Sequence, residues 1–95
     1  MEKDQTIIAL VNNLEKLPKY YLIEFVDNWD ADLCAIGIKR GSRLVYISIY
    51  NGNGKYDYDL ELLDTVNIEK LNVIKEERGV SEEDLINEIK RFLLT

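Results

Sequence analysis

The fold of this chain is decided by the stretch Leu44–Glu61, which reads LVYISIYNGNGKYDYDLE. Two runs of alternating side chains flank residues 51–54 (NGNG), and Asn and Gly tolerate the positive φ angles that tight hairpin turns demand. With these four residues as the loop, Tyr50 lies opposite Lys55. The stretch therefore predicts a β-hairpin whose two faces differ in chemistry.

One face of this hairpin is apolar and the other is polar. The first collects large side chains: Val45, Ile47, Ile49, Tyr56, Tyr58 and Leu60. The second collects mostly polar ones: Leu44, Tyr46, Ser48, Tyr50, Lys55, Asp57, Asp59 and Glu61. A half-buried antiparallel sheet shows this division, so we expect the first face against a core and the second face outward.

Further strands are expected on both sides of the hairpin. Upstream, Tyr20–Val26 and Leu33–Lys39 are rich in β-branched and aromatic residues and are separated by short polar connectors. Downstream, Asp64–Arg78 is compatible with a strand or a short helix, and the poor helix seed Asn72-Val73-Ile74 favours a strand. The sequence thus predicts a meander of four or five antiparallel strands. Its inner face would also carry Tyr21, Ile23, Phe25, Cys34, Ile36 and Ile38, with Glu24 pointing outward.

Two amphipathic helices are predicted at the ends of the chain. Apolar residues at helical spacing indicate a first helix over Asp4–Leu17, capped by Asp4 or Thr6 and ended by Pro18. Ser81 with Asp84 three residues later is a variant of the capping box, and it precedes a second helix over Glu82–Leu94. Both helices need an apolar surface to cover. We therefore expect one α+β domain over residues 1–95, with the N- and C-terminal helices packed on one face of the sheet.

Composition and charge exclude several classes of protein. The chain has 95 residues, of which 46% are hydrophobic, and no apolar run approaches the roughly 18–20 residues that span a bilayer. Its start lacks the basic and apolar pattern of a signal peptide, and a single cysteine permits no internal disulfide, so we expect a cytoplasmic protein. A net charge of −6 argues against direct binding of nucleic acid.

Groups that carry chemistry are scarce in this sequence. The absence of histidine removes the commonest general base and the Ser–His and Cys–His dyads. Cys34 is expected to be a small core residue, not a nucleophile. Three carboxylates, Asp27, Asp30 and Asp32, surround Trp29 and offer oxygen ligands to a hard cation, but their spacing is not that of an EF-hand, so a solvated loop is favoured. We expect no enzyme activity, no cofactor and no metal.

The remaining candidate for function is a binding surface. We expect the following residues to contact a partner: Glu24, Trp29, Tyr46, Tyr50, Asp57, Asp59 and Glu61. Tyrosine and tryptophan give large contact areas at low entropy cost, and carboxylates attract a basic partner. The alternative is a solvated sheet face, on which Tyr is an ordinary strand former and Asp protects against aggregation.

The chain resembles the immunity proteins of bacterial toxin–immunity pairs, including those of contact-dependent growth inhibition. The likeness lies in the small acidic α+β frame and in the segments Tyr21–Asp30, Leu44–Ser48 and Val80–Leu85. It implies a cytoplasmic protein that binds and neutralises a cognate toxin domain, often a basic nuclease. Two alternatives stay open: another small acidic adaptor or complex subunit, and a frataxin-like metal-handling protein. The acidic ridge of frataxin-like proteins lies largely on the first helix, which here has few carboxylates.

Overall fold

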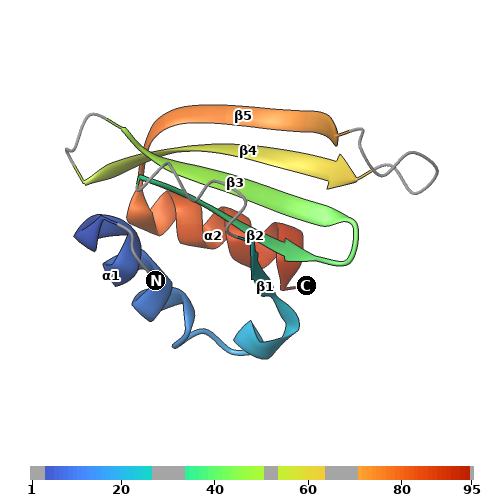
Figure 1. Ribbon diagram of the computed structural model, residues 1–95, viewed down its shortest axis with the longest axis horizontal. Helices are drawn as coiled ribbons and strands as arrows, with labels where there is room; N and C mark the ends of the chain where they lie inside the picture. Colours follow the sequence, from blue (N-terminus) through green and yellow to red (C-terminus); the bar gives the residue numbers. More distant parts are fainter. Residues whose placement is uncertain (1–3, 27–33, 51–53, 64–70, 95) are drawn as a thin grey trace.

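The computed structural model describes residues 4–26, 34–50, 54–63 and 71–94. Its elements in chain order are α1 (Gln5–Leu14), the 3₁₀ helix η1 (Tyr20–Leu22), β1 (Glu24–Val26), β2 (Ala35–Arg40), β3 (Arg43–Tyr50), β4 (Lys55–Leu63), β5 (Leu71–Ser81) and α2 (Glu82–Leu93). The strands form one antiparallel sheet in sequential order, and both helices lie on the same face of it (Figure 1). The predicted α+β meander is confirmed, with five strands.

The register of the central hairpin is the predicted one. Tyr50 pairs with Lys55 and Ile49 pairs with Tyr56 across β3 and β4. The apolar face of the hairpin points to the helices, and Val45 and Ile47 are completely buried. The preceding β2–β3 turn closes on the pair Arg40 and Arg43, which leaves a two-residue loop that begins at Gly41 with a φ of 61°. Glycine at this first position is typical of a type II′ hairpin turn.

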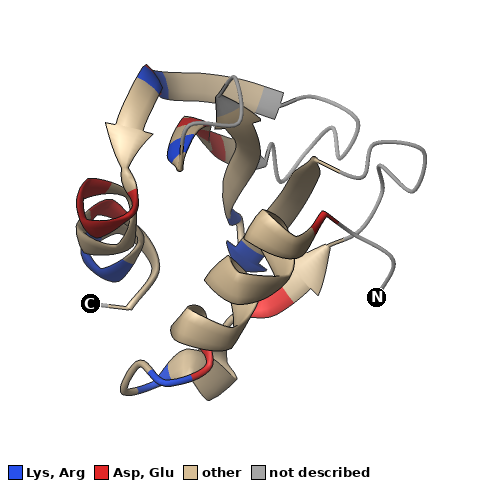
Figure 2. Ribbon diagram, turned by 90° about the vertical axis from the view of Figure 1, so that its left-hand side faces the viewer, with Lys and Arg blue, Asp and Glu red and all other residues tan. Residues whose placement is uncertain are grey.

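The core lies between the sheet and the two helices. Side chains from α1, α2 and the inner face of the sheet form one buried cluster. The fully buried members from the helices are Ile7, Leu10, Leu14, Leu85, Ile89 and Leu93. Figure 2 shows how the sheet curves over α1 and α2, so that the helices cover its inner face. Of the described residues, no helix is long and apolar enough to cross a membrane.

The first helix is shorter than predicted. Asp4 caps it as expected, because its carboxylate accepts a hydrogen bond from the Thr6 amide at 2.8 Å. The helix ends at Leu14 instead of Leu17. Proline disfavours the helical conformation of the residue before it, and the last turn tightens with a short bond from the Leu17 amide to the Leu14 carbonyl at 3.0 Å.

The prediction of a strand over Tyr20–Val26 is wrong in its first half. Lys19 has a φ of 66°, and the chain then forms the 3₁₀ turn of η1 before β1 begins. Short bonds from Leu22 to Lys19 and from Ile23 to Tyr20 satisfy these backbone groups locally, so they need no partner strand. As a result Tyr21 is 74% exposed and is not on the inner face.

Cys34 is not a core residue. It is exposed and lies in a turn directly before β2, where its carbonyl accepts a hydrogen bond from the Ile49 amide at 3.0 Å. β2 begins at Ala35, so Cys34 lies just before the first residue of the strand. The predicted inner residues Ile36 and Ile38 are completely buried.

The ambiguous stretch before the last helix is a strand where it is described. β5 spans Leu71–Ser81, and residues 64–70 lie outside the described part of the chain. Ser81 ends this strand and also caps α2, because its hydroxyl accepts a hydrogen bond from the Asp84 amide at 3.1 Å. The predicted cap and terminal helix are confirmed.

Candidate partner-binding face

The candidate site lies on the outer face of β3 and β4, opposite the helices (Figure 1). Tyr46 pairs with Asp59 and Ser48 pairs with Asp57, so two rows of the ladder place these four side chains together. With Tyr58 and Arg78 they line a shallow pocket of about 100 Å³. The face that the sequence predicted as polar thus contains a small hollow.

A bulge in β5 brings Arg78 to this pocket. Val80 lies opposite Tyr56 and Glu77 lies opposite Tyr58, so two residues of β5 face the single Asp57 between them. Gly79 adopts a φ of 64° at this point, and its amide donates to Asp57 Oδ1 at 2.9 Å. Bulges redirect side chains. Here the Arg78 guanidinium reaches Asp59 Oδ1 at 3.2 Å.

The pocket carries more negative than positive charge. Its lining contains two carboxylates and one guanidinium. Hydrogen bonding to Asp59 raises the pKa of Arg78, so the guanidinium stays charged. The contacts of Asp57 and Asp59 use Oδ1 of each, and within the described part of the chain Oδ2 of each accepts no hydrogen bond. Two carboxylate oxygens are therefore available to a positively charged ligand.

The size of the pocket limits what it can hold. A water molecule occupies about 30 Å³ of the liquid, and pockets for small-molecule ligands begin at about 300 Å³. A volume of about 100 Å³ fits the end of one side chain and not a metabolite. Ammonium and guanidinium groups suit it best, because carboxylates pair with them.

Glu61 lies on the outer face as predicted but is nearly buried. It pairs with Leu44, and only 8% of its surface is exposed. Burial raises the pKa of Glu61, and the negative charges of Asp59 and Glu76 raise it further. Glu61 therefore offers little exposed charge to a partner.

The other predicted contact residues lie apart from the pocket or outside the described residues. Glu24 is on β1, two strands from β3, and its carboxylate faces Lys39 Nζ at 3.8 Å. Tyr50 occupies the outer-face row next to Ser48, but its side chain is not among those described. Trp29 and the carboxylates Asp27, Asp30 and Asp32 fall in 27–33, also outside the described residues. The structure thus brings together Tyr46, Asp57 and Asp59.

Sequence reasoning did not name Arg78 or Ser48 as contact residues. Ser48 lies on the outer face, as the alternation predicts, but a serine at that position gives no sign in the sequence that it contacts a partner. Arg78 reaches the face only because β5 bulges. The one available signal was Gly79, since an isolated glycine inside a strand often marks a bulge.

The opposite side of the same strands is joined to α2 by buried polar contacts. Tyr56 donates its hydroxyl proton to Glu82 Oε1 at 3.1 Å, and Asn13 of α1 donates to Glu82 Oε2 at 3.1 Å. Burial, together with the Glu82 carboxylate, raises the pKa of Tyr56 to about 12. Glu88, 7% exposed, pairs with Lys75 at 3.1 Å and with Arg91. The Tyr56–Glu82 and Lys75–Glu88 contacts fix α2 to the sheet that carries the pocket.

Comparison of the chain with protein-family models, with curated proteins and with solved structures found no match.

Proposed function

We propose that this protein is an immunity protein that binds a bacterial toxin domain in the cytoplasm and neutralises it without catalysis. The observation that carries the binding role is the outer-face pocket. It is acidic, it is lined by Tyr46, and it is sized for one basic side chain. The likeness of three segments to immunity proteins and the net charge of −6 support a basic toxin domain as the partner.

A simple binding mode follows from this geometry. A lysine or arginine of the toxin would enter the pocket beside Tyr46 and pair with Oδ2 of Asp57 and Asp59. Buried aromatic and charged anchors of this kind dominate interface energies. The adaptor alternative uses the same surface with another basic partner, and the identity of the partner separates the two.

The metal-handling alternative has less support. Among the described residues, no group of three or more Cys, Asp or Glu side chains is arranged to hold a metal ion. The segment Gln5–Leu14, which forms α1, contains no carboxylate on which an acidic ridge could be built.

The first test is co-expression with the protein encoded by the adjacent reading frame. We expect that protein to be toxic alone, to be tolerated in the presence of this chain and to co-purify with it as a stable complex. Rescue of growth without a stable complex would contradict neutralisation by binding. A harmless neighbour that nevertheless binds would favour the adaptor alternative.

The second test asks which face binds. The double variant Asp57→Asn with Asp59→Asn removes two charges but keeps oxygen acceptors for the Gly79 amide and for Arg78. Its matched control is Glu83→Gln with Asp84→Asn, which removes two exposed charges from the first turn of α2. We expect the sheet variant to stay folded and to lose at least about tenfold in affinity, which corresponds to about 1.4 kcal/mol of binding free energy. Equal losses would mean that only net charge matters, and a loss in the control alone would place the partner elsewhere.

A further inference from the structure

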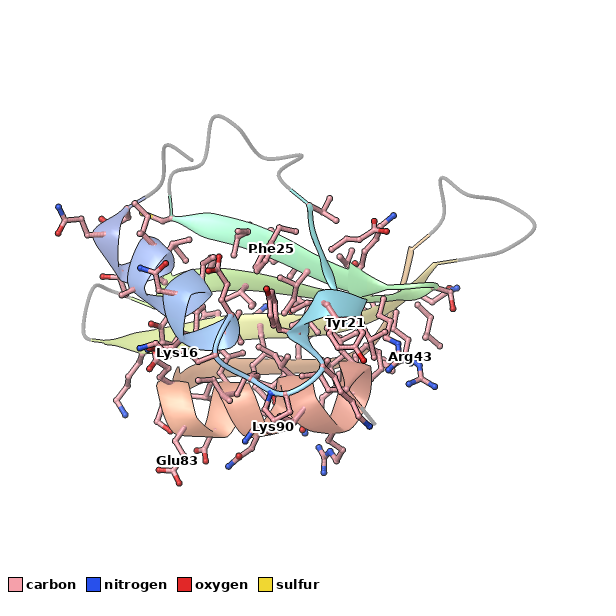
Figure 3. The ribbon with its side chains drawn as sticks, turned by 90° about the horizontal axis from the view of Figure 1, so that it is seen from below. Lys16, Tyr21, Phe25, Arg43, Glu83 and Lys90 are labelled. Carbon is pink, nitrogen blue, oxygen red and sulfur yellow. The ribbon has the colours of Figure 1, made fainter. Side chains whose placement is uncertain are left out.

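The β2–β3 turn carries two arginines directed to the end of α2. Arg40 and Arg43 form the closing pair of the turn. Arg40 Nη1 donates to the Leu93 carbonyl at 2.8 Å, and Arg43 Nη1 donates to the Phe92 carbonyl at 2.9 Å. Carbonyls at a helix C-terminus lack partners within the helix and attract positive charge. Figure 3 shows Arg43 beside the end of α2 that lies away from Glu83.

These anchors leave most of the arginine donors unused. A guanidinium has five N–H groups, and each of these two arginines donates one of them to a backbone carbonyl of α2. Within the described residues neither arginine forms an ion pair with a carboxylate, although the chain has 18 aspartates and glutamates. Like charges directly opposite one another on neighbouring strands are destabilising. The turn therefore holds two positive charges that an anion would stabilise.

The space at this turn is lined by hydrogen-bond donors. A pocket of about 330 Å³ is bounded by Arg40, Gly41, Ser42 and Arg43. No atom outside the neighbouring residues lies within 4 Å of the position that a Cβ on Gly41 would occupy, so the backbone of the turn is open to a ligand. Besides the guanidinium groups, the turn offers the Ser42 hydroxyl and backbone amides. The lining of the pocket contains no carboxylate.

We propose that the β2–β3 turn is a phosphate-binding site, distinct from the outer-face pocket. A phosphate monoester carries a charge of about −1.5 to −2 near neutral pH and three acceptor oxygens, which matches two guanidinium groups and a hydroxyl. The planar fork of arginine donors fits such oxygens in pairs. Anchoring one edge of each guanidinium on α2 fixes the direction of the remaining donors before the ligand arrives.

The test is a titration of the ¹⁵N-labelled protein with inorganic phosphate, and with glycerol 1-phosphate, at constant ionic strength against chloride. We expect the amide signals of Gly41 and Ser42 to shift with a Kd of about 1 mM or tighter for one or both anions. Tighter binding of the ester identifies an esterified phosphate as the ligand, and equal binding identifies the free anion. No shift at Gly41 and Ser42 with either anion would overturn the proposal.

Two variants test whether the turn binds phosphate or whether its two arginines only cap the end of α2. Ser42→Asp adds a carboxylate to the turn and keeps both arginine anchors, so it should weaken phosphate binding at least about tenfold by competition and repulsion. Lys90→Gln, in the exposed last turn of α2, changes the net charge equally and should change the Kd less than about twofold, because it lies outside the pocket. A Ser42→Asp protein that binds phosphate as the parent does, or an equal loss in Lys90→Gln, would contradict a site at this turn.

Discussion

Replacing Tyr56 with phenylalanine should remove a pH-dependent part of the stability of the fold. Tyr56 is 2% exposed, and its hydroxyl donates to Glu82, which also holds Asn13 of α1. Hydrogen bonds to charged groups contribute about 1.5–3 kcal/mol. We therefore expect Tyr56→Phe to lower the free energy of unfolding by about 2 kcal/mol at pH 7.

The pH dependence follows from the raised pKa of Tyr56. The value rises from 10.0 to about 12 in the folded protein, so the folded state holds the proton more tightly than the unfolded chain. This contribution is fully present below pH 10 and is lost as the pH rises from 10 to 12. One pKa unit corresponds to about 1.4 kcal/mol, so about 1.4 kcal/mol is lost by pH 11.

The assay is urea unfolding of the parent protein and the variant at pH 8 and pH 11. The difference in their unfolding free energies should shrink by about 1.4 kcal/mol between the two pH values. Subtracting the variant cancels the contribution of Tyr58, whose pKa burial also raises. Tyr21→Phe is the matched control, because Tyr21 is 74% exposed and should change stability by less than about 0.5 kcal/mol at either pH. A Tyr56→Phe difference that stays constant to pH 11 would refute the raised pKa, and with it the burial of the Tyr56 hydroxyl beside Glu82.

Three further outcomes are expected. Ser81→Ala removes the cap of α2 and should lower the unfolding free energy by about 1 kcal/mol in urea denaturation, whereas Ser42→Ala should not. Gly79→Ala forces a side chain into a φ of 64° and should cost about 1–2 kcal/mol in the same assay; an unchanged value would mean that the bulge is absent in solution. Association with the proposed toxin partner, followed by stopped flow, should slow markedly between about 0.05 and 0.5 M salt if carboxylates steer the encounter, and a salt-independent rate would limit the negative charge to solubility.

The central hairpin could be predicted from sequence because several local signals agree there. The sequence of residues 51–54 predicts a turn that pairs Tyr50 with Lys55, which is the observed offset between β3 and β4, and alternation then assigns each side chain to a face. A one-residue slip would have placed Val45 and Ile47 in solvent, so one register was clearly favoured. The cap at Ser81 could be predicted for a similar reason, since its partner is only three residues away.

The contents of the site could not be predicted in the same way. Alternation gives the face of Glu61 but not its burial, which depends on neighbouring strands. Arg78 reaches Asp59 through a bulge that shifts the β4–β5 register, and period-two patterning contains no information about such a shift. Tyr21 is exposed because local hydrogen bonds form a 3₁₀ turn where the pattern predicts a strand, and Cys34 lies in a turn before the first residue of β2.

The protein has a net charge of −6, but it carries two surfaces of opposite sign. The two proposed binding sites can therefore be tested separately. The outer-face pocket holds Asp57 and Asp59, whereas Arg40 and Arg43 extend from the helix side of the sheet to the end of α2. The two sites share no lining residue. Changes at sites without shared partners act nearly independently. Asp57→Asn with Asp59→Asn should therefore weaken binding of the proposed toxin partner and leave the phosphate shifts of Gly41 and Ser42 unchanged, while Ser42→Asp should do the reverse. Loss of both activities in either variant would show that the effects are general ones of charge or folding, and not of two sites.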